Sequence, residues 1–245
     1  MTAAMPMLSA PQILPLGRTG LLVRFALESS VEALGAAQAF LSEAKAAELP
    51  GALRVSSSLA SVCVEFDPTC TTREALAEDV RVLLGTRDWA AQAALAPTRR
   101  WDIPVAFGGE AGPQLMEAAT MAGLSPKRAI ADITSTELRV LAIGFAPGQP
   151  YLGLLPAHWA LPRQTALTPT VPAGAIVVAI QQIVLFSGPS TTGWRQVGLT
   201  RFRPFQRERA EPFALRQGDA IRFHAAPELP MTPDGMGGAR CEALA

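Results

Sequence analysis

Residues 144–156 read Gly-Phe-Ala-Pro-Gly-Gln-Pro-Tyr-Leu-Gly-Leu-Leu-Pro, and they follow the largely apolar run 138–145. The apolar run predicts a buried strand, and the proline and glycine cluster behind it predicts that the chain leaves the sheet in a fixed loop. The prolines lock φ, whereas Gly144, Gly148 and Gly153 permit positive φ values that other residues resist. Such a loop could turn its backbone amides toward a carbonyl or an anion. The alternative is a structural crossover between two strands.

Three short blocks of sequence follow this loop. They are Leu161-Pro162-Arg163, Val171-Pro172-Ala173-Gly174 and Gly193-Trp194. In their order and spacing, the loop and the three blocks resemble the family of allophanate hydrolase subunit 1. That family also includes the B subunit of bacterial 5-oxoprolinase and the Kip-type inhibitor of a sporulation histidine kinase. The resemblance extends from about residue 11 to about residue 224.

The composition is that of a globular protein without an excess of either charge. Of the 245 residues, 49% are hydrophobic and 17% are charged, and the formal net charge is zero. A chain of this length can fold into two domains of common size. Because there is no positive field, we expect neither nucleic acid nor a membrane as a partner, and a protein or a small molecule is favoured.

The cysteines and histidines do not form the pattern of a metal site or a disulfide framework. Cys63, Cys70 and Cys241 are widely spaced and include no C-x-x-C pair, and His158 and His224 are far apart in the sequence. We therefore expect no metal and no prosthetic group. The start of the chain lacks the basic and apolar pattern of a secretory signal, and the longest apolar stretch is too short to span a bilayer. These features predict a soluble cytoplasmic protein.

The first part of the chain predicts an α+β domain. Strands are expected at 13–27, divided by a turn, at 52–55 and at 61–66, and helices at 31–48 and from residue 71 onward. The second helix is predicted to open with a capping box, Thr71-x-x-Glu74. It carries Leu76, Val80 and Leu83 at the spacing of one helical face. The order predicts an antiparallel sheet with both helices on one face.

The second part predicts a barrel. Beyond a boundary between residues 97 and 98 we expect a strand at 101–107, helices at 112–122 and 125–131, and strands at 138–145, 175–179, 183–186, 195–199 and 220–224. Many short strands with glycine and proline turns are typical of a closed or nearly closed barrel.

The predicted fold class is therefore α+β, with a small N-terminal antiparallel sheet and two helices over residues 1–97. The resemblance implies that residues 98–226 form a cyclophilin-like β-barrel domain. Residues 227–245 show no period and are predicted to be an irregular tail outside the core.

Several motifs of known chemistry are absent or ambiguous. The sequence contains no Walker A loop, no G-x-G-x-x-G and no G-x-S-x-G, so nucleotide binding by a standard glycine-rich loop and a hydrolase nucleophile elbow are both unsupported. Residues 201–209 place four arginines among two phenylalanines. This run could contact nucleic acid, but at zero net charge a solvated loop or a protein contact is favoured.

The candidate site residues offer groups that could bind a small acid or amide. Arg163 offers a planar fork of donors, Tyr151 a hydroxyl, Gln182 an amide, Glu110 a carboxylate and Trp194 an aromatic face. The alternatives are a structural hydrogen bond for Arg163, a role in a turn for Glu110 and a core position for Trp194. The other candidates for substrate binding are Gly144, Phe145, Pro147, Gly148, Leu152 and Pro162. Because no nucleophile–base pair is present, catalytic residues stay unassigned and a second chain is expected to complete the site.

The resemblance implies a subunit of a heteromeric, ATP-dependent 5-oxoprolinase, which opens 5-oxo-L-proline to L-glutamate, or of a related allophanate or amide hydrolase complex. It implies a companion large subunit and a small acidic or amide substrate as partners, with ATP as a co-substrate of the complex. The chain departs from the family pattern at 180–187 and 198–201, where bulky or neutral residues stand. These residues would close backbone amides off from a ligand. The alternative function is therefore a non-catalytic regulator that binds and inhibits a sensor histidine kinase.

Overall fold

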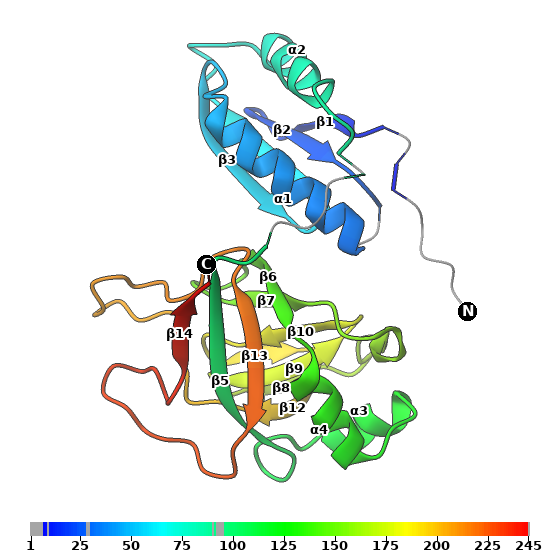
Figure 1. Cartoon of the computed structure of the whole chain (residues 1–245), viewed down its shortest axis with the longest axis vertical. Helices are drawn as coiled ribbons and strands as arrows, with labels where there is room; N and C mark the ends of the chain where they lie inside the picture. The colour runs from blue at the N-terminus through cyan, green and yellow to red at the C-terminus, as the bar shows by residue number, and fades with distance from the viewer. Residues whose placement is uncertain (1–6, 9, 28–29, 90, 92–95, 245) are drawn as a thin grey trace. The chain divides into compact units, whose positions relative to one another are not determined.

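The computed structural model describes residues 7–8, 10–27, 30–89, 91 and 96–244. The chain divides into two compact units, Met1–Ala96 and Pro97–Ala245 (Figure 1). Each unit has its own cluster of buried apolar side chains, which is the mark of a separately packed domain. None of the helices in the described residues is long and apolar enough to cross a membrane.

The first unit is an antiparallel sheet with two helices on one face. Its elements are β1 (Gln12–Leu16), β2 (Gly20–Arg24), α1 (Val31–Ala46), β3 (Ala52–Ser58), β4 (Ser61–Phe66) and α2 (Arg73–Leu84). The strands lie in the order β1-β2-β4-β3. Val62, Val64 and Phe66 alternate along β4 and pack in one cluster with side chains of both helices. The predicted α+β layer is confirmed.

The start of α2 lies one residue later than the capping-box pattern predicts. Thr72, and not Thr71, is the N-cap, because its Oγ1 accepts a hydrogen bond of 3.2 Å from the amide of Ala75. Glu74 is then the second helical residue, whereas a capping box needs an acid at the third. The predicted helical face is nevertheless correct, since Leu76 is completely buried.

The second unit is a barrel with two helices beside it. Its elements are β5 (Arg99–Phe107), α3 (Leu115–Met121), α4 (Pro126–Ser135), β6 (Leu138–Ile143), β7 (Pro150–Gly153), η1 (Ala157–Trp159), β8 (Thr168–Val171), β9 (Ala175–Ala179), β10 (Gln182–Leu185), β11 (Ser190–Thr192), β12 (Arg195–Leu199), β13 (Ala220–Ala225) and β14 (Arg240–Ala243). Seven strands follow one another as β12-β9-β10-β7-β6-β13-β5, and pairing of β12 with β5 closes the barrel. The predicted barrel is confirmed.

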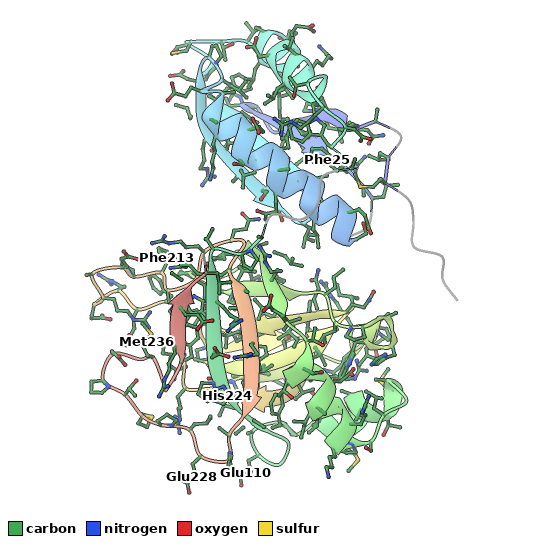
Figure 2. The ribbon with its side chains drawn as sticks, in the orientation of Figure 1. Phe25, Glu110, Phe213, His224, Glu228 and Met236 are labelled. Carbon is green, nitrogen blue, oxygen red and sulfur yellow. The ribbon has the colours of Figure 1, made fainter. Side chains whose placement is uncertain are left out.

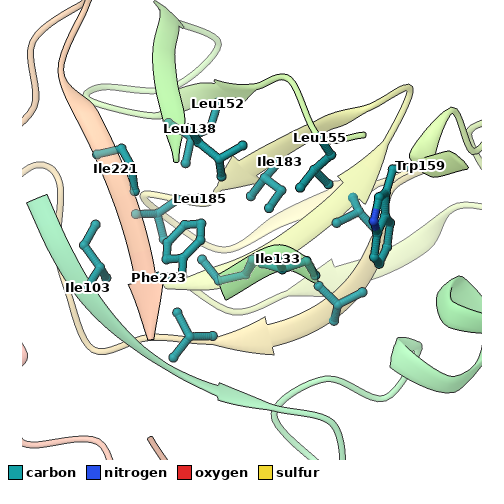
Figure 3. Close-up of a cluster of buried hydrophobic side chains, with 14 of the residues drawn as sticks. Ile103, Ile133, Leu138, Leu152, Leu155, Trp159, Ile183, Leu185, Ile221 and Phe223 are labelled. Atoms are coloured by element: carbon teal, nitrogen blue, oxygen red, sulfur yellow. The ribbon is translucent and has the colours of Figure 1, made fainter. Parts of the chain in front are cut away.

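The barrel core is formed by the inward side chains of alternate strand residues. On β10, Ile183 and Leu185 point into this core, together with Leu152 of β7 (Figure 3). Val184 lies on the opposite face of β10 and belongs to a second apolar cluster. Because successive residues of a strand alternate between faces, the barrel also has a partly apolar outer surface at this place.

Three short strands, β7, β8 and β11, lie where the sequence analysis expected only loops. The loop after β6 is therefore shorter than predicted, because β7 begins at Pro150, which pairs with Ile143. Proline has no N–H for the ladder but is accepted as the first residue of a strand. β8 and β11 pair only with each other, in a separate antiparallel ribbon.

The tail over residues 227–245 is not wholly irregular, which corrects the prediction. β14 pairs antiparallel with the first half of β5, from Arg99 to Asp102. β12 pairs with the same edge of β5 only at Ala106 and Phe107. Without β14, the first half of that edge of β5 would have no hydrogen-bonded neighbour. All four residues of β14 are exposed, and the strand therefore lacks the hydrophobic alternation from which it could have been predicted.

The turn between β9 and β10 is held in an unfavourable backbone conformation. Ala179 pairs with Gln182, which leaves a two-residue turn with φ of 45° at Ile180 and 61° at Gln181. Turns of this kind favour glycine or asparagine, because a side chain at positive φ crowds the backbone and a β-branched one most of all. The turn is anchored by the Ile180 amide, which donates to the carbonyl of Leu161 at 2.8 Å.

We predict that Ile180→Gly raises the free energy of unfolding by about 0.5–1.5 kcal/mol, because it relieves the positive-φ penalty of about 1–2 kcal/mol at some entropic cost. Part of the side-chain burial is lost in this variant, since Ile180 is 45% exposed, and this loss limits the gain. Urea denaturation measures the change. Ile180→Val keeps the β-branch and is the matched control, for which no gain is expected. Equal destabilisation of both variants would contradict the prediction.

Candidate functional site

A cavity of about 290 Å³ lies on the outer face of the barrel, over β7 and β10. Tyr151, Val184 and Phe186 form its floor, and the segments around Arg163 and Trp194 form its walls. The remaining lining residues are Phe145, Gln149, Gln164, Leu167, Thr191, Thr192 and Gly193. The volume is at the lower end of the range of small-molecule sites.

Trp194 is the centre of the cavity wall. Its ring meets Tyr151 edge to face, with 6.2 Å between the ring centroids and 76° between the ring planes. The guanidinium carbon of Arg163 lies 5.5 Å from the centroid of the Trp194 ring, which is within the range of a cation–π contact. Among the described residues no carboxylate forms an ion pair with Arg163. The cavity therefore presents a cation whose charge is not balanced by the described part of the protein at that point.

A chain of glutamine hydrogen bonds fixes the position of Trp194. The side chain of Gln164 donates from Nε2 to the backbone carbonyl of Trp194 at 3.1 Å. The backbone N–H of Gln164 donates to the carbonyl of Gly193 at 2.7 Å. Gln114, just before α3, donates to Oε1 of Gln164 at 2.7 Å and accepts from the amide of Gln196 at 3.0 Å. The aromatic wall is thus tied to α3 and to β12, and does not depend on its own loop alone.

The loop between β6 and β7 forms the mouth of the cavity. It is closed by a hydrogen bond of 3.0 Å from the Gly144 amide to the Gln149 carbonyl. Gly148 has φ of 69°, and a Cβ added there would lie 2.7 Å from Cβ of Phe205, so only glycine fits. Phe145 also has a positive φ, 72°, and the residue is 77% exposed. Residues with an unfavourable backbone conformation occur often in functional loops, and this one also exposes an aromatic side chain to solvent.

Residues 11–215 match the family model of the carboxyltransferase domain, subdomains C and D. The chain belongs to this carboxyltransferase C/D family. Two similar proteins both bear the name of the B subunit of 5-oxoprolinase. The one from Escherichia coli O157:H7 is 38% identical over 138 residues, which are 56% of this chain and 63% of that protein. The one from Bacillus subtilis is 30% identical over 222 residues, which are 86% of this chain and 91% of that protein.

The solved structures agree with the C/D fold. The crystal structure of TTHA0988 has a TM-score of 0.70 and 32% sequence identity over 87% of this chain. This chain covers 41% of TTHA0988, and it covers less than two thirds of the E. coli relative. The urea amidolyase of Kluyveromyces lactis has a TM-score of 0.68 over 90% of this chain and 16% of that one, but only 13% identity, so it supports the fold alone.

In this carboxyltransferase C/D chain, four of the predicted site residues lie together. Phe145, Tyr151, Arg163 and Trp194 all line the cavity, although they come from the β6–β7 loop, β7 and two later segments. Among the other predicted loop residues, Gly144, Pro147 and Gly148 shape the loop without lining the cavity.

The remaining predicted residues lie outside the cavity. Leu152 is completely buried in the barrel core, because it faces inward where its neighbour Tyr151 faces outward. Gln182 is buried on β10, and the carbonyl of Pro162 accepts a hydrogen bond from Arg195. Glu110 lies in the turn after β5 (Figure 2), which agrees with its alternative role as a turn residue.

The structure also adds lining residues that the sequence analysis missed. Gln149, Gln164 and Thr192 line the cavity, and nothing in their local sequence distinguishes them from ordinary loop residues. The bulky residues of the 180–187 segment do not fill the site. Val184 and Phe186 are its buried floor, and the cavity remains open above them.

Proposed function

We propose that this chain is a B-type subunit of a heteromeric, ATP-dependent 5-oxoprolinase of the cytoplasm, which converts 5-oxo-L-proline to L-glutamate. The observation that carries this proposal is the guanidinium of Arg163, without a carboxylate partner among the described residues, over the aromatic wall of a small cavity. Relatives that are named as the B subunit of 5-oxoprolinase support the same reaction. A cation beside flat aromatic faces is complementary to a small, flat carboxylic acid.

In this proposal Arg163 binds the substrate carboxylate and the aromatic wall orients its ring. The planar guanidinium can donate two parallel hydrogen bonds to one carboxylate, which fixes direction as well as position. Trp194 and Tyr151 provide faces about at right angles to each other, at 76°. The substrate ring would therefore be held in one orientation before the reaction, which lowers the entropic part of the barrier.

The cavity does not contain the groups for the complete reaction. The described residues that line it include no carboxylate, histidine, lysine or cysteine, so the Tyr151 hydroxyl is their one acid–base side chain and no nucleophile–base pair is present. The reaction consumes one ATP and two water molecules for each 5-oxoproline and yields glutamate, ADP and phosphate. In our proposal a companion large subunit supplies the catalytic groups and the ATP site, because this chain carries no standard nucleotide-binding loop.

The mouth of the cavity fits a surface that the companion subunit covers. Phe145 and Leu167 are 77% and 61% exposed, and both line the cavity. Exposed apolar side chains around a functional cavity are typical of an interaction surface. In this arrangement the companion would close the cavity from solvent and bring its catalytic groups to the bound acid.

Co-expression with the companion subunit, followed by an assay of ATP-dependent glutamate formation from 5-oxoproline, tests the proposal. Activity that requires this chain, the companion and ATP is the expected result. Absence of glutamate formation by the assembled complex would contradict it. Inhibition of the autophosphorylation of a sensor histidine kinase by an inactive chain would favour the regulatory function instead.

Arg163→Lys is predicted to weaken substrate binding in the assembled complex by about 1.5–3 kcal/mol, the contribution of a charge-assisted hydrogen bond. Lysine keeps the charge but loses the planar fork. Measured KM and kcat/KM report the change. Arg207→Lys, at an exposed arginine outside the cavity, is the matched control. If Arg163→Lys lowers the free energy of unfolding by as much as it weakens substrate binding, the role of Arg163 is purely structural.

A further inference from the structure

A second cavity lies on the outer face of the barrel, over β5, β13 and β14. Its volume is about 550 Å³, and it is lined by Asp102, Arg222, His224, Gly238 and Arg240. It shares no lining residue with the first cavity, which lies over β7 and β10. The volume is within the range of small-molecule sites. This second cavity has no role in the proposed function.

The pairing of three strands brings the charged side chains of this cavity together. β5 lies between β13 and β14, and Asp102 of β5 pairs with Arg222 on one side and with Arg240 on the other. His224, near the end of β13 (Figure 2), follows Arg222 by two residues and therefore points to the same face. Phe223, between them, is buried in the barrel core. The charged side chains thus project outward from the barrel.

Positive charge exceeds negative charge among the side chains that line the second cavity. Nε of Arg222 donates to Oδ1 of Asp102 at 2.6 Å, so the one lining carboxylate already has a cationic partner. The guanidinium of Arg240 forms no ion pair or hydrogen bond with the described residues. Glu242, the acid on β14, pairs with Arg100 instead. The cavity therefore keeps one cation without a counter-ion in the described part of the chain.

The donors of this cavity are open to a ligand. Arg222, His224 and Arg240 are all exposed. The wall at Gly238 has φ of 80°, and a Cβ added there would lie 2.7 Å from Cγ of Pro230. Because this wall consists of backbone alone, it takes up no room that a ligand needs.

The arrangement of these donors matches a phosphate group better than a carboxylate. Neighbouring strands lie about 4.8 Å apart, so the two arginines on either side of β5 are about 10 Å apart at Cα and can reach an anion from opposite sides. The imidazole of His224 adds an N–H at a third position. A carboxylate has two oxygens in one plane, whereas a phosphate group has at least three that point in different directions. Phosphate also carries the larger negative charge at pH 7.

We propose that the second cavity binds the phosphate group of a small molecule through Arg222, His224 and Arg240. Binding here goes beyond the proposed function and does not depend on it, because the two cavities share no residue. The net charge of zero favours a small molecule over nucleic acid, whose phosphates are bound by an extended basic surface. The Asp102 carboxylate competes with the phosphate for the guanidinium of Arg222.

Titration calorimetry on the purified full-length chain, at constant pH and ionic strength, tests this assignment with three probes. Inorganic phosphate and glycerol 3-phosphate carry the phosphate group, and succinate carries a similar charge on two carboxylates. Both phosphates are expected to bind, and succinate is expected to bind about fivefold more weakly or not at all. Tighter binding of glycerol 3-phosphate than of inorganic phosphate would identify a phosphate ester as the ligand, and the reverse order would identify the free anion.

Three variants with native melting temperatures separate the site from general charge effects. Arg240→Gln should weaken the binding of both phosphates about tenfold, because it removes the cation without a counter-ion. Arg207→Gln makes the same change at an exposed arginine outside the cavity and should leave the affinity within about twofold. Asp102→Asn should act in the opposite direction and strengthen binding about threefold, because it removes the competing charge beside Arg222.

Four results would overturn the assignment. They are no binding of either phosphate at millimolar concentration, equal affinity for succinate and phosphate, equal effects of Arg240→Gln and Arg207→Gln, and weaker phosphate binding by Asp102→Asn. The last result would be decisive even if Arg240→Gln folded poorly, because it would show that the carboxylate helps binding. All four measurements use this chain alone, so they are separate from the assay of glutamate formation by the complex.

Discussion

Asp219→Ala is expected to lower the free energy of unfolding of the barrel by about 3–5 kcal/mol, the effect of breaking a buried ion pair. Asp219 is 4% exposed and stands just before β13. Its carboxylate accepts from Nε and Nη2 of Arg99 at 2.9 and 2.5 Å, from the indole of Trp101 at 3.2 Å and from the amide of Arg216 at 2.8 Å. Alanine would leave all of these donors without their common acceptor.

Urea unfolding followed by tryptophan fluorescence measures this change, because Trp101, Trp159 and Trp194 report on the barrel unit. Arg222→Ala is the control. It breaks the ion pair of Arg222 with Asp102, which lies on the surface, and should shift the midpoint only slightly. An Asp219→Ala variant that is no less stable than this control would show that the buried carboxylate is not needed.

Leu76→Ala is expected to destabilise the first unit by about 2–5 kcal/mol, since it removes a buried side chain and leaves a cavity. Leu76 is completely buried on α2, in the cluster that also contains Phe40 and Trp89. Trp89 meets Phe40 edge to face at 5.3 Å between centroids, so its fluorescence reports on the same cluster.

A valine on the other side of α2 offers a matched control. Val82 lies on the same helix and is 67% exposed, so Val82→Ala should cost much less stability than Leu76→Ala. Thermal unfolding of both variants distinguishes packing from helix propensity. Equal melting temperatures would show that Leu76 does not pack in the core.

The parts of the fold with local patterns were predictable from the sequence. The face of α2 and the alternation of β4 depend on residues that are neighbours in the chain, and both were predicted. β14 was not, because its four residues are exposed and its pairing with β5 is decided by an edge more than a hundred residues away. β7 was not predicted either, because its first residue is a proline, which indicates a loop when the sequence is considered alone.

In the candidate site, too, some residues could be predicted from the sequence and others depend on tertiary contacts. The resemblance to a family pointed to Arg163 and Trp194, which the structure brings together in one wall. Spacing alone could not have separated Tyr151, which faces the cavity, from Leu152, which faces the core, before the register of β7 was known. The close approach of Gly148 to Phe205 is a tertiary contact that the local sequence does not reveal.

The double pairing of β5 has a consequence for how the barrel forms during synthesis. β5 is the first strand of this unit to be made, and its parallel partner β13 follows far later, with Asp102 and Arg222 separated by 120 residues. At about 5–20 residues per second, ribosomal synthesis would separate them by about 6–24 s. For most of that time, until β12 is made, both edges of β5 lack their final partners and can pair with other nascent chains. Protection of this strand, by a chaperone or by rapid synthesis, is therefore expected to raise the yield of folded protein.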